Sequence, residues 1–158
     1  MADKKVLIIM GSDSDFPVME GCFRNLKKFG IDYDIHIASA HRSPDKAHKL
    51  AAEARDNGYA AIIAAAGLAA HLAGVLASNT ILPVIGVPCK GGALNGVDAL
   101  YATVQMPSGI PVATVSVNGA KNAALLAVSI LSLSNPGLAA ALQSFRDQQA
   151  ENIKRTEI

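Results

Sequence analysis

The stretch Ser39–Pro44, with the sequence SAHRSP, contains the side chains best suited to chemistry. Histidine transfers protons more readily near neutral pH than other side-chain types, so His41 is the candidate general acid and base. The guanidinium group of Arg42 can form two parallel hydrogen bonds with a phosphate or a carboxylate. Ser43 can cap a helix that begins at Pro44, whose N-terminus adds positive potential. The stretch therefore predicts proton transfer beside a bound anion, with an ordinary polar loop as the competing interpretation.

A second polar stretch, Gly11–Asp15 with the sequence GSDSD, follows an apolar run near the N-terminus. A Gly-Ser turn at the start of a helix offers backbone N–H groups and hydroxyls to a phosphate. Two carboxylates in the same stretch argue against a fully anionic ligand lying across it. Asp15 is expected to accept hydrogen bonds from ribose hydroxyls or to cap the following helix, and the two roles are compatible. Asp13 is expected to be exposed to solvent.

Two stretches rich in Gly and Ala complete the candidate loops: AGLAAHLAG at residues 66–74 and KGGALNG at residues 90–96. Their small residues allow the backbone to approach a ligand closely. His71 lies at the start of an apolar helical segment, where a structural, hydrogen-bonded histidine is expected rather than a catalyst. Cys89 is expected in a loop at the same rim, and the sequence offers it no obvious base, so it is not expected to act as a nucleophile.

The composition excludes several classes of partner. The chain has 158 residues, 14 basic and 13 acidic, and no basic run, so no nucleic-acid partner is expected. Its apolar stretches are too short or too interrupted for a signal peptide or a membrane span, so no membrane association is expected. Two distant cysteines indicate a reduced, cytoplasmic protein. The sequence has no dinucleotide-binding or phosphate-loop glycine motif, no nucleophile elbow and no metal-ligand spacing, which predicts acid–base chemistry without cofactor or metal.

Short apolar runs alternate with helical segments and must position these loops. The predicted strands span residues 6–10, 33–38, 59–65, 83–88 and 110–117. The predicted helices span residues 16–29, 44–57, 69–79, a short segment ending near 104, 120–133 and about 136–155. This order predicts one domain, residues 1–158, with an α/β fold: a three-layer αβα sandwich, a flavodoxin-like doubly wound parallel sheet of about five strands, and an extra C-terminal helix. Ligands bind outside the carboxyl ends of such strands, so the four loops should meet at one rim.

The motifs, taken together, resemble the PurE family. GSDSD, SAHRSP, AAHLAG, PVIGVP, ALNGVDALYATVQMPSGIPVATV and NAALLAVSIL occur in that family's order and cover nearly the whole chain. The combination of SAHR[ST]P with VQMPxGxPV is far more specific than any single short match. The resemblance implies a flavodoxin-like subunit assembled as a homo-octamer, with sites at subunit boundaries. It also implies a small ribonucleotide substrate, N5-carboxyaminoimidazole ribonucleotide, and a mutase reaction that yields 4-carboxy-5-aminoimidazole ribonucleotide in purine (IMP) biosynthesis.

The resemblance also assigns roles to individual residues. In the family's mechanism the carbamate loses carbon dioxide into a closed pocket, and C4 of the imidazole then attacks it. His41 matches the residue that protonates the departing nitrogen and later accepts the ring proton. Ser12, Asp15 and Arg42 match substrate-binding positions, with Arg42 expected on the 5′-phosphate and Asp15 near the ribose. Weaker substrate-binding candidates are Gly11, Ser14, Ser39, Ala40, Ser43, Gly67, Ala70 and His71.

The sequence departs from the PurE pattern in the pocket wall. Ala65, Leu68 and Ala73 stand where the pattern GAGGAAHLPG has two glycines and a proline, and the segment Ser116–Ala123 is about two residues shorter. Leucine in place of glycine is expected to narrow the pocket or redirect the loop, above all if that position has positive φ. These departures bear on substrate geometry and rate and leave the expected fold unchanged.

Three other functions remain open from the sequence. A second class of PurE proteins carboxylates aminoimidazole ribonucleotide directly with carbon dioxide, and Arg42, where that class is expected to have lysine, favours the mutase. A flavodoxin-like module that binds FMN is disfavoured by the acidic GSDSD stretch and the scarcity of aromatic residues. A signalling receiver domain would need an aspartate at the end of the third strand, where the chain has Ala64–Ala66.

Overall fold

The computed structural model describes residues 5–154, which are built around a five-stranded parallel sheet. The strands are β1 (Lys5–Met10), β2 (Tyr33–Ile37), β3 (Tyr59–Gly67), β4 (Val84–Cys89) and β5 (Ala113–Thr114). They lie in the order β2-β1-β3-β4-β5, and every neighbouring pair is parallel. In this flavodoxin-like order the winding reverses between β1 and β3, where doubly wound sheets bind their ligands. The predicted fold class is confirmed.

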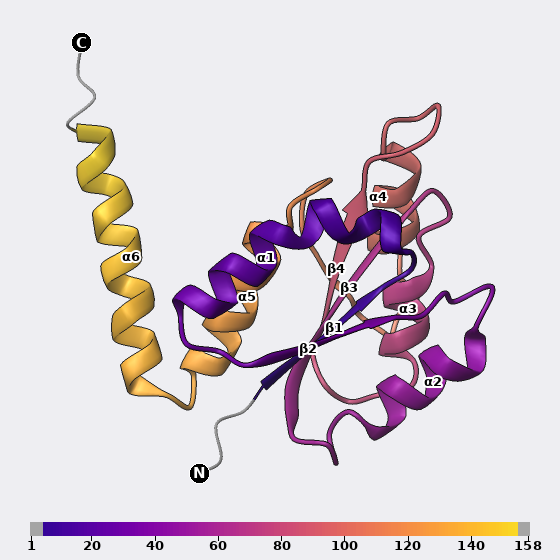
Figure 1. The fold of residues 1–158 in the computed structure, drawn as a ribbon, viewed down its shortest axis with the longest axis horizontal. Helices are drawn as coiled ribbons and strands as arrows, with labels where there is room; N and C mark the ends of the chain where they lie inside the picture. The colour runs from indigo at the N-terminus through magenta and orange to yellow at the C-terminus, as the bar shows by residue number, and fades with distance from the viewer. Residues whose placement is uncertain (1–4, 155–158) are drawn as a thin grey trace.

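Helices cover both faces of the sheet (Figure 1). One face carries α1 (Phe16–Lys28) and α5 (Ala120–Ser132), and the other carries α2 (Pro44–Glu53), α3 (Leu72–Ala77) and α4 (Val97–Val104). Side chains alternate along a strand, so Ile8 of β1 packs toward α1 and α5 while Ile9 packs toward α2 and α3. Burial on both faces explains why β1 is a continuous apolar run.

The C-terminal helix, α6 (Pro136–Lys154), extends beyond the sandwich, as the sequence predicted (Figure 1). Its first turns are anchored, because Leu138 and Leu142 are buried and the ring of Phe145 meets that of Phe29 edge-on at 5.7 Å. The predicted end near Arg155 lies outside the described residues. None of the helices in residues 5–154 is long and apolar enough to cross a membrane.

Three predicted elements were too long. The last strand pairs with β4 only at Ala113–Thr114 rather than over residues 110–117, since Pro111 has no N–H to donate to a strand ladder. Helix α3 begins at Leu72, three residues late, because the preceding residues form tight turns that follow Leu68 at φ 53°. Helix α2 ends at Glu53, and residues 54–58 continue as turns instead of helix.

Candidate active site

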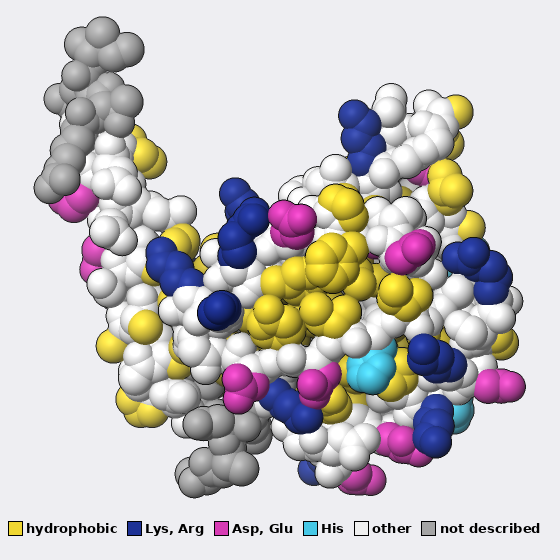
Figure 2. Space-filling view, in the orientation of Figure 1, with side chains coloured by type: hydrophobic (Ala, Val, Ile, Leu, Met, Phe, Trp, Pro, Cys, Tyr) yellow, Lys and Arg dark blue, Asp and Glu magenta, His cyan; other side chains and the backbone are white. Residues whose placement is uncertain are grey.

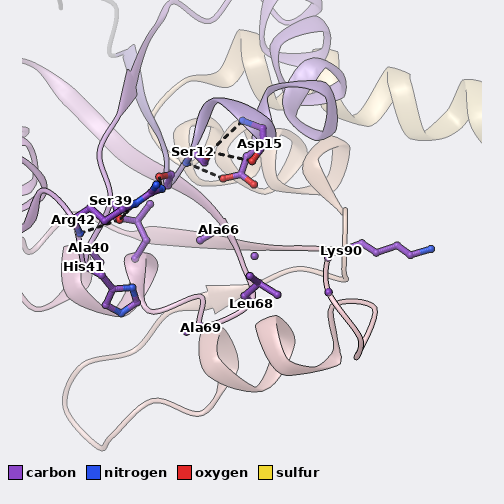
Figure 3. Close-up of a pocket in the computed structure, with 16 residues that line it drawn as sticks. Ser12, Asp15, Ser39, Ala40, His41, Arg42, Ala66, Leu68, Ala69 and Lys90 are labelled. Atoms are coloured by element: carbon purple, nitrogen blue, oxygen red, sulfur yellow. Dashed lines mark hydrogen bonds between the residues drawn. The ribbon is translucent and has the colours of Figure 1, made fainter.

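The carboxyl ends of β1 to β4 surround a cavity of about 500 Å³ (Figure 3). The four loops that the sequence predicted to meet all contribute to its lining. The lining residues are Gly11, Ser12, Ser14, Asp15, Ser39, Ala40, His41, Arg42, Ala66, Gly67, Leu68, Ala69, Leu72, Lys90, Gly91 and Gly92. In Figure 3 His41 and Arg42 lie at one side and Lys90 at the other, with Ala66 and Leu68 between them.

The loop after β1 presents a fixed, buried carboxylate. A short 3-10 helix, η1 (Asp13–Asp15), follows Ser12, whose backbone N–H donates to Asp15 Oδ2 at 3.1 Å. Asp15 stands at the N-cap position of α1 but makes no side-chain cap there, so the predicted capping role is wrong. Only 8% of Asp15 is exposed, and this burial raises the pKa of its carboxyl above the ordinary value. The side chain is therefore a rigid acceptor at the base of the cavity.

The loop after β2 is folded by its own serines. The backbone N–H of Ser39 donates to Ser43 Oγ at 2.8 Å, and the Ser43 hydroxyl donates to the Ser39 carbonyl at 3.2 Å. Ser43 therefore does not cap α2 with its side chain, contrary to the prediction, and it lines an adjoining hollow of about 390 Å³ rather than the main cavity. Arg42 lines both spaces. Its Nη2 lies 3.4 Å from the Gly11 carbonyl, so the exposed guanidinium retains donors for an anion.

His41 is paired with His71. Nε2 of His41 lies 2.9 Å from Nδ1 of His71, and the two rings meet edge-to-face with their centroids 5.0 Å apart. One proton serves this hydrogen bond, and the tautomers decide which ring donates it. The sequence favoured a structural, hydrogen-bonded role for His71, and its partner is the candidate catalytic residue. His71 and the buried Ala70 are not among the residues that line the cavity, unlike His41.

Cys89 is a buried thiol beneath the site, whereas the sequence predicted it in a loop at the rim. It ends β4 and is 2% exposed. Burial, and then the negative charge of Asp15, raise the pKa of the Cys89 thiol to about 12. A thiol that stays protonated at neutral pH is a poor nucleophile. Gly67 lies against it, because a Cβ at Gly67 would be 3.3 Å from the Cys89 carbonyl oxygen.

Comparison with known proteins places the chain in a family. A sequence profile described as AIR carboxylase matches residues 5–152. The chain belongs to the AIR carboxylase family. A Pyrococcus abyssi protein named N5-carboxyaminoimidazole ribonucleotide mutase is 54% identical over 151 residues, which are 96% of this chain and 84% of that protein. The chloroplastic phosphoribosylaminoimidazole carboxylase of Vigna aconitifolia is 48% identical over 147 residues, which are 93% of this chain and 26% of that protein.

The same relationship appears among solved structures. The crystal structure of Treponema denticola PurE superimposes with a TM-score of 0.88 at 33% sequence identity, covering 96% of this chain and 95% of that chain. The resemblance to the PurE family inferred from the motifs is thereby confirmed. Membership of the AIR carboxylase family explains why the SAHRSP stretch lies at the rim of a flavodoxin-like sheet.

Sequence reasoning about this member of the AIR carboxylase family missed part of the cavity wall. Leu68, Lys90 and Gly92 line the cavity but were not among the predicted site residues. The available signal was the rim position of KGGALNG, which contains a cation beside two glycines. The side chain of Lys90 extends away from the cavity in Figure 3, so its backbone is what faces the site. Leu68 stands where the PurE pattern has a glycine, and its φ is 53°, so this leucine does adopt a positive φ.

The described residues show no candidate metal centre: within 5–154 no three His, Cys, Asp or Glu side chains are grouped to hold an ion. The expectation of chemistry without metal or cofactor stays a prediction. His41 and Arg42 are exposed in the single chain, so the closed, water-excluding pocket expected from the family mechanism is not formed by these residues alone.

Proposed function

We propose that this chain is an N5-carboxyaminoimidazole ribonucleotide mutase, which forms 4-carboxy-5-aminoimidazole ribonucleotide in purine (IMP) biosynthesis. The observation that carries the proposal is the hydrogen-bonded pair of His41 and His71 beside Arg42 at the carboxyl edge of the sheet. A histidine for proton transfer next to a cation for a phosphate is what this reaction needs. The Pyrococcus abyssi mutase, which this chain matches over 84% of its length, supports the same conclusion.

The proposed chemistry needs one proton carrier. The N–C bond of the substrate carbamate breaks, carbon dioxide leaves, and the electron pair remains on the nitrogen, which takes a proton from His41. C4 of the imidazole then attacks carbon dioxide to form the new C–C bond. His41 accepts the proton that C4 loses, which restores its starting state. Because Nδ1 of His71 lies 2.9 Å from Nε2 of His41, it fixes the imidazole as its charge changes.

The same geometry supports the proposed binding contacts. The exposed Arg42 guanidinium, between the two cavities, would take the 5′-phosphate as a charge-assisted hydrogen-bond donor. The buried carboxylate of Asp15 would accept hydrogen bonds from the ribose hydroxyls, and Ser12 contributes at the same loop. Ala66 and Gly67 provide a wall without long side chains, where the imidazole can approach the backbone.

We also propose a cytoplasmic, single-domain protein that assembles as a homo-octamer with its sites at subunit boundaries. Exposed His41 and Arg42 support a boundary site, because a second subunit would exclude water from them. An apolar patch, visible over α1 and β2 in Figure 2, includes the exposed side chains of Phe16, Ile35 and Ile37. Eight copies of the 16.3 kDa chain would give a particle of about 130 kDa, which light scattering after size exclusion would measure. A particle of about 16 kDa would contradict this assembly.

The second candidate is direct carboxylation of aminoimidazole ribonucleotide with carbon dioxide. The similarity to the Vigna aconitifolia carboxylase favours it, whereas Arg42 favours the mutase. Purified protein would receive N5-carboxyaminoimidazole ribonucleotide in one sample and aminoimidazole ribonucleotide with bicarbonate in another. Product formation is followed by ultraviolet absorbance of the carboxylated imidazole. Fast conversion of the first substrate, with the second used only at high bicarbonate, supports the mutase. Efficient use of the second and neglect of the first would establish the carboxylase instead.

Three substitutions test the assigned roles. His41→Asn should lower kcat at least about 100-fold while substrate still binds, because only proton transfer is lost. His71→Asn should lower kcat less, by about tenfold, since the proton carrier remains but is less well oriented. Arg42→Leu should mainly weaken binding, by a few kcal/mol at most, for one charge-assisted contact. Near-normal turnover by the His41 variant would reject it as the proton carrier, and unchanged affinity of the Arg42 variant would place the phosphate elsewhere.

A further inference from the structure

Three non-glycine residues with positive φ meet at one loop. Among the described residues these are Leu68, Asn95 and Asn118, with φ of 53°, 51° and 57°. We define the rim loop as Lys90–Gly96. Asn95 lies within it, and Asn118 Oδ1 accepts the backbone N–H of Lys90 at 2.8 Å. Asparagine adopts positive φ readily, whereas leucine rarely does, so Leu68 is the residue whose backbone requires support. The bond from Lys90 to Asn118 fixes one end of the rim loop.

Leu68 provides the contact on the cavity side of the rim loop. A Cβ added to Gly92 would lie 2.6 Å from Leu68 Cδ2, so the leucine side chain occupies the space that a side chain at position 92 would need. The neighbouring Gly91 has nothing within 4 Å of its added Cβ. Of these two adjacent glycines, only Gly92 lies against Leu68. Leu68 and Gly92 both line the cavity, so their contact joins the loop after β3 to the loop after β4 within the cavity wall.

The positive φ of Leu68 costs conformational energy, so we ask which contact of its side chain holds it there. A glycine adopts positive φ freely, whereas an L-residue with a Cβ is strained there. Leu68 keeps this backbone while 55% of the residue stays exposed, so burial in the core does not hold it. What the side chain supplies is the contact with Gly92. A glycine in its place would relieve the strain and leave the rim loop without that support.

We propose that Leu68 is a positioning residue that holds the rim loop over the cavity and thereby limits the escape of the one-carbon unit during turnover. The second half of this statement rests on the proposed mutase function. Carbon dioxide released from the carbamate can either be captured by C4 or leave through the mouth. If it leaves, aminoimidazole ribonucleotide remains in place of the carboxylated product. The Leu68–Gly92 contact is part of the wall that lines the cavity, so its loss should loosen that wall and increase the uncoupled outcome.

The first experiment needs no substrate. Hydrogen–deuterium exchange of peptides that cover the rim loop is compared between the wild-type protein and Leu68→Ala, which retains the Cβ strain but removes Cδ2. Because Leu68 is about half exposed, loss of its contact should raise exchange by about three- to tenfold. Leu68→Gly removes the strain as well and should show at least the same increase. Unchanged exchange in Leu68→Ala would overturn the proposal, whatever the enzyme catalyses.

The second experiment measures how the released carbon dioxide partitions between capture by C4 and escape from the cavity. The ratio of aminoimidazole ribonucleotide to carboxylated product is determined after correction for decay of the carbamate without enzyme. Leu68→Ala should raise this ratio about three- to tenfold with little change in KM. An unchanged ratio together with faster exchange would show that the loop moves without controlling escape, and would overturn the catalytic half. If the wild-type protein forms no carboxylated product, the mutase assignment fails while the exchange result still decides the loop contact.

A pair of glycine substitutions tests the contact itself. Gly92→Ala should impair turnover in the wild-type background, where the new Cβ meets Leu68, and impair it several-fold less in the Leu68→Ala background. The φ strain at position 92 is the same in both backgrounds and cancels in the comparison. Gly30→Ala is the matched control, since Gly30 has a similar φ of 66° with nothing within 4 Å of its added Cβ. Equal effects of Gly92→Ala in both backgrounds would show that the two residues are not coupled.

Discussion

Gly86, in the middle of β4, leaves the space that α4 and the residue before β5 occupy against the sheet. A Cβ at this position would lie 2.3 Å from Thr103 Cγ2 and 3.0 Å from Val112 Cγ1. Thr103 has little freedom to move, because it is 2% exposed and its hydroxyl donates to the Ala99 carbonyl at 2.7 Å. Gly86→Ala therefore adds a methyl group to a space that is already filled, and we expect it to destabilise the fold.

The size of the effect follows from the packing. Extra methyl groups in a close-packed core cost about 1–3 kcal/mol, and contacts this short on two sides place Gly86→Ala near 3 kcal/mol. The corresponding fall in Tm is about 6–12 °C for a chain of this size. Thr103→Ser removes the clashing Cγ2 but keeps the hydroxyl, and alone it should cost about 1 kcal/mol. Combined with Gly86→Ala, it should recover about 1–2 kcal/mol relative to the Gly86→Ala variant.

Urea unfolding followed by circular dichroism, at one chain concentration for all proteins, gives the free energies of unfolding of the wild type, the two single variants and the double variant. Gly91→Ala is the control for adding a methyl group to a glycine, since nothing lies within 4 Å of its Cβ, and it should stay within about 0.5 kcal/mol of the wild type. A Gly86→Ala protein as stable as the wild type would refute the packing argument. A double variant no more stable than Gly86→Ala alone would locate the strain away from Thr103.

Two further predictions concern ionisation. The Lys5 ammonium and then the Tyr59 hydroxyl donate to Asp34 and hold the pKa of its carboxyl below the ordinary 3.8. This stabilisation is complete above that value and is lost as pH falls through the lower folded pKa. Asp34→Asn should therefore cost at most about 1 kcal/mol at neutral pH, and the stabilities of wild type and variant should converge as pH falls below 3.8. A difference that stays constant as pH falls below that value would contradict the argument. Burial raises the pKa of the thiols of Cys22 and Cys89 to about 12, so neither should react with iodoacetamide in the folded protein near pH 8, while both react in urea. Labelling of Cys89 in the folded protein, measured by mass spectrometry, would show that the end of β4 opens.

The parts of the fold that sequence predicted correctly are those with one dominant cause. Strands β1 and β4 are buried on both faces, and such strands require apolar runs that are visible in the sequence. The predicted strand over residues 110–117 has an equally suitable composition. It fails because pairing is a property of two strands, and β4 offers hydrogen bonds to it only near Gly86. The local sequence pattern indicates a preference for strand, whereas hydrogen bonding to the neighbouring strand determines how long the strand is.

The candidate site divides in the same way. The rule that ligands bind at the carboxyl ends of strands brought Asp15, Arg42 and His41 to one rim without any knowledge of the structure. The pairing of His41 with His71 could not be derived, because the two residues are 30 positions apart and their contact depends on the loop between β3 and α3. The path of that loop includes a positive φ at Leu68, and the residue type does not predict this because positive φ is uncommon for leucine.

The site combines a rigid floor with an exposed rim, and this division assigns different tasks to the two parts. Asp15 is buried and bonded to the Ser12 backbone, so its acceptor position exists before any ligand binds. His41 and Arg42 are exposed, and their interactions with substrate compete with water unless something covers them. Under the proposed assignments, the floor would select the ribose with little reorganisation, whereas rapid proton transfer would depend on how well the rim is closed. If the Leu68–Gly92 contact limits escape as proposed, loosening it should affect the fate of the released carbon dioxide before it affects substrate affinity.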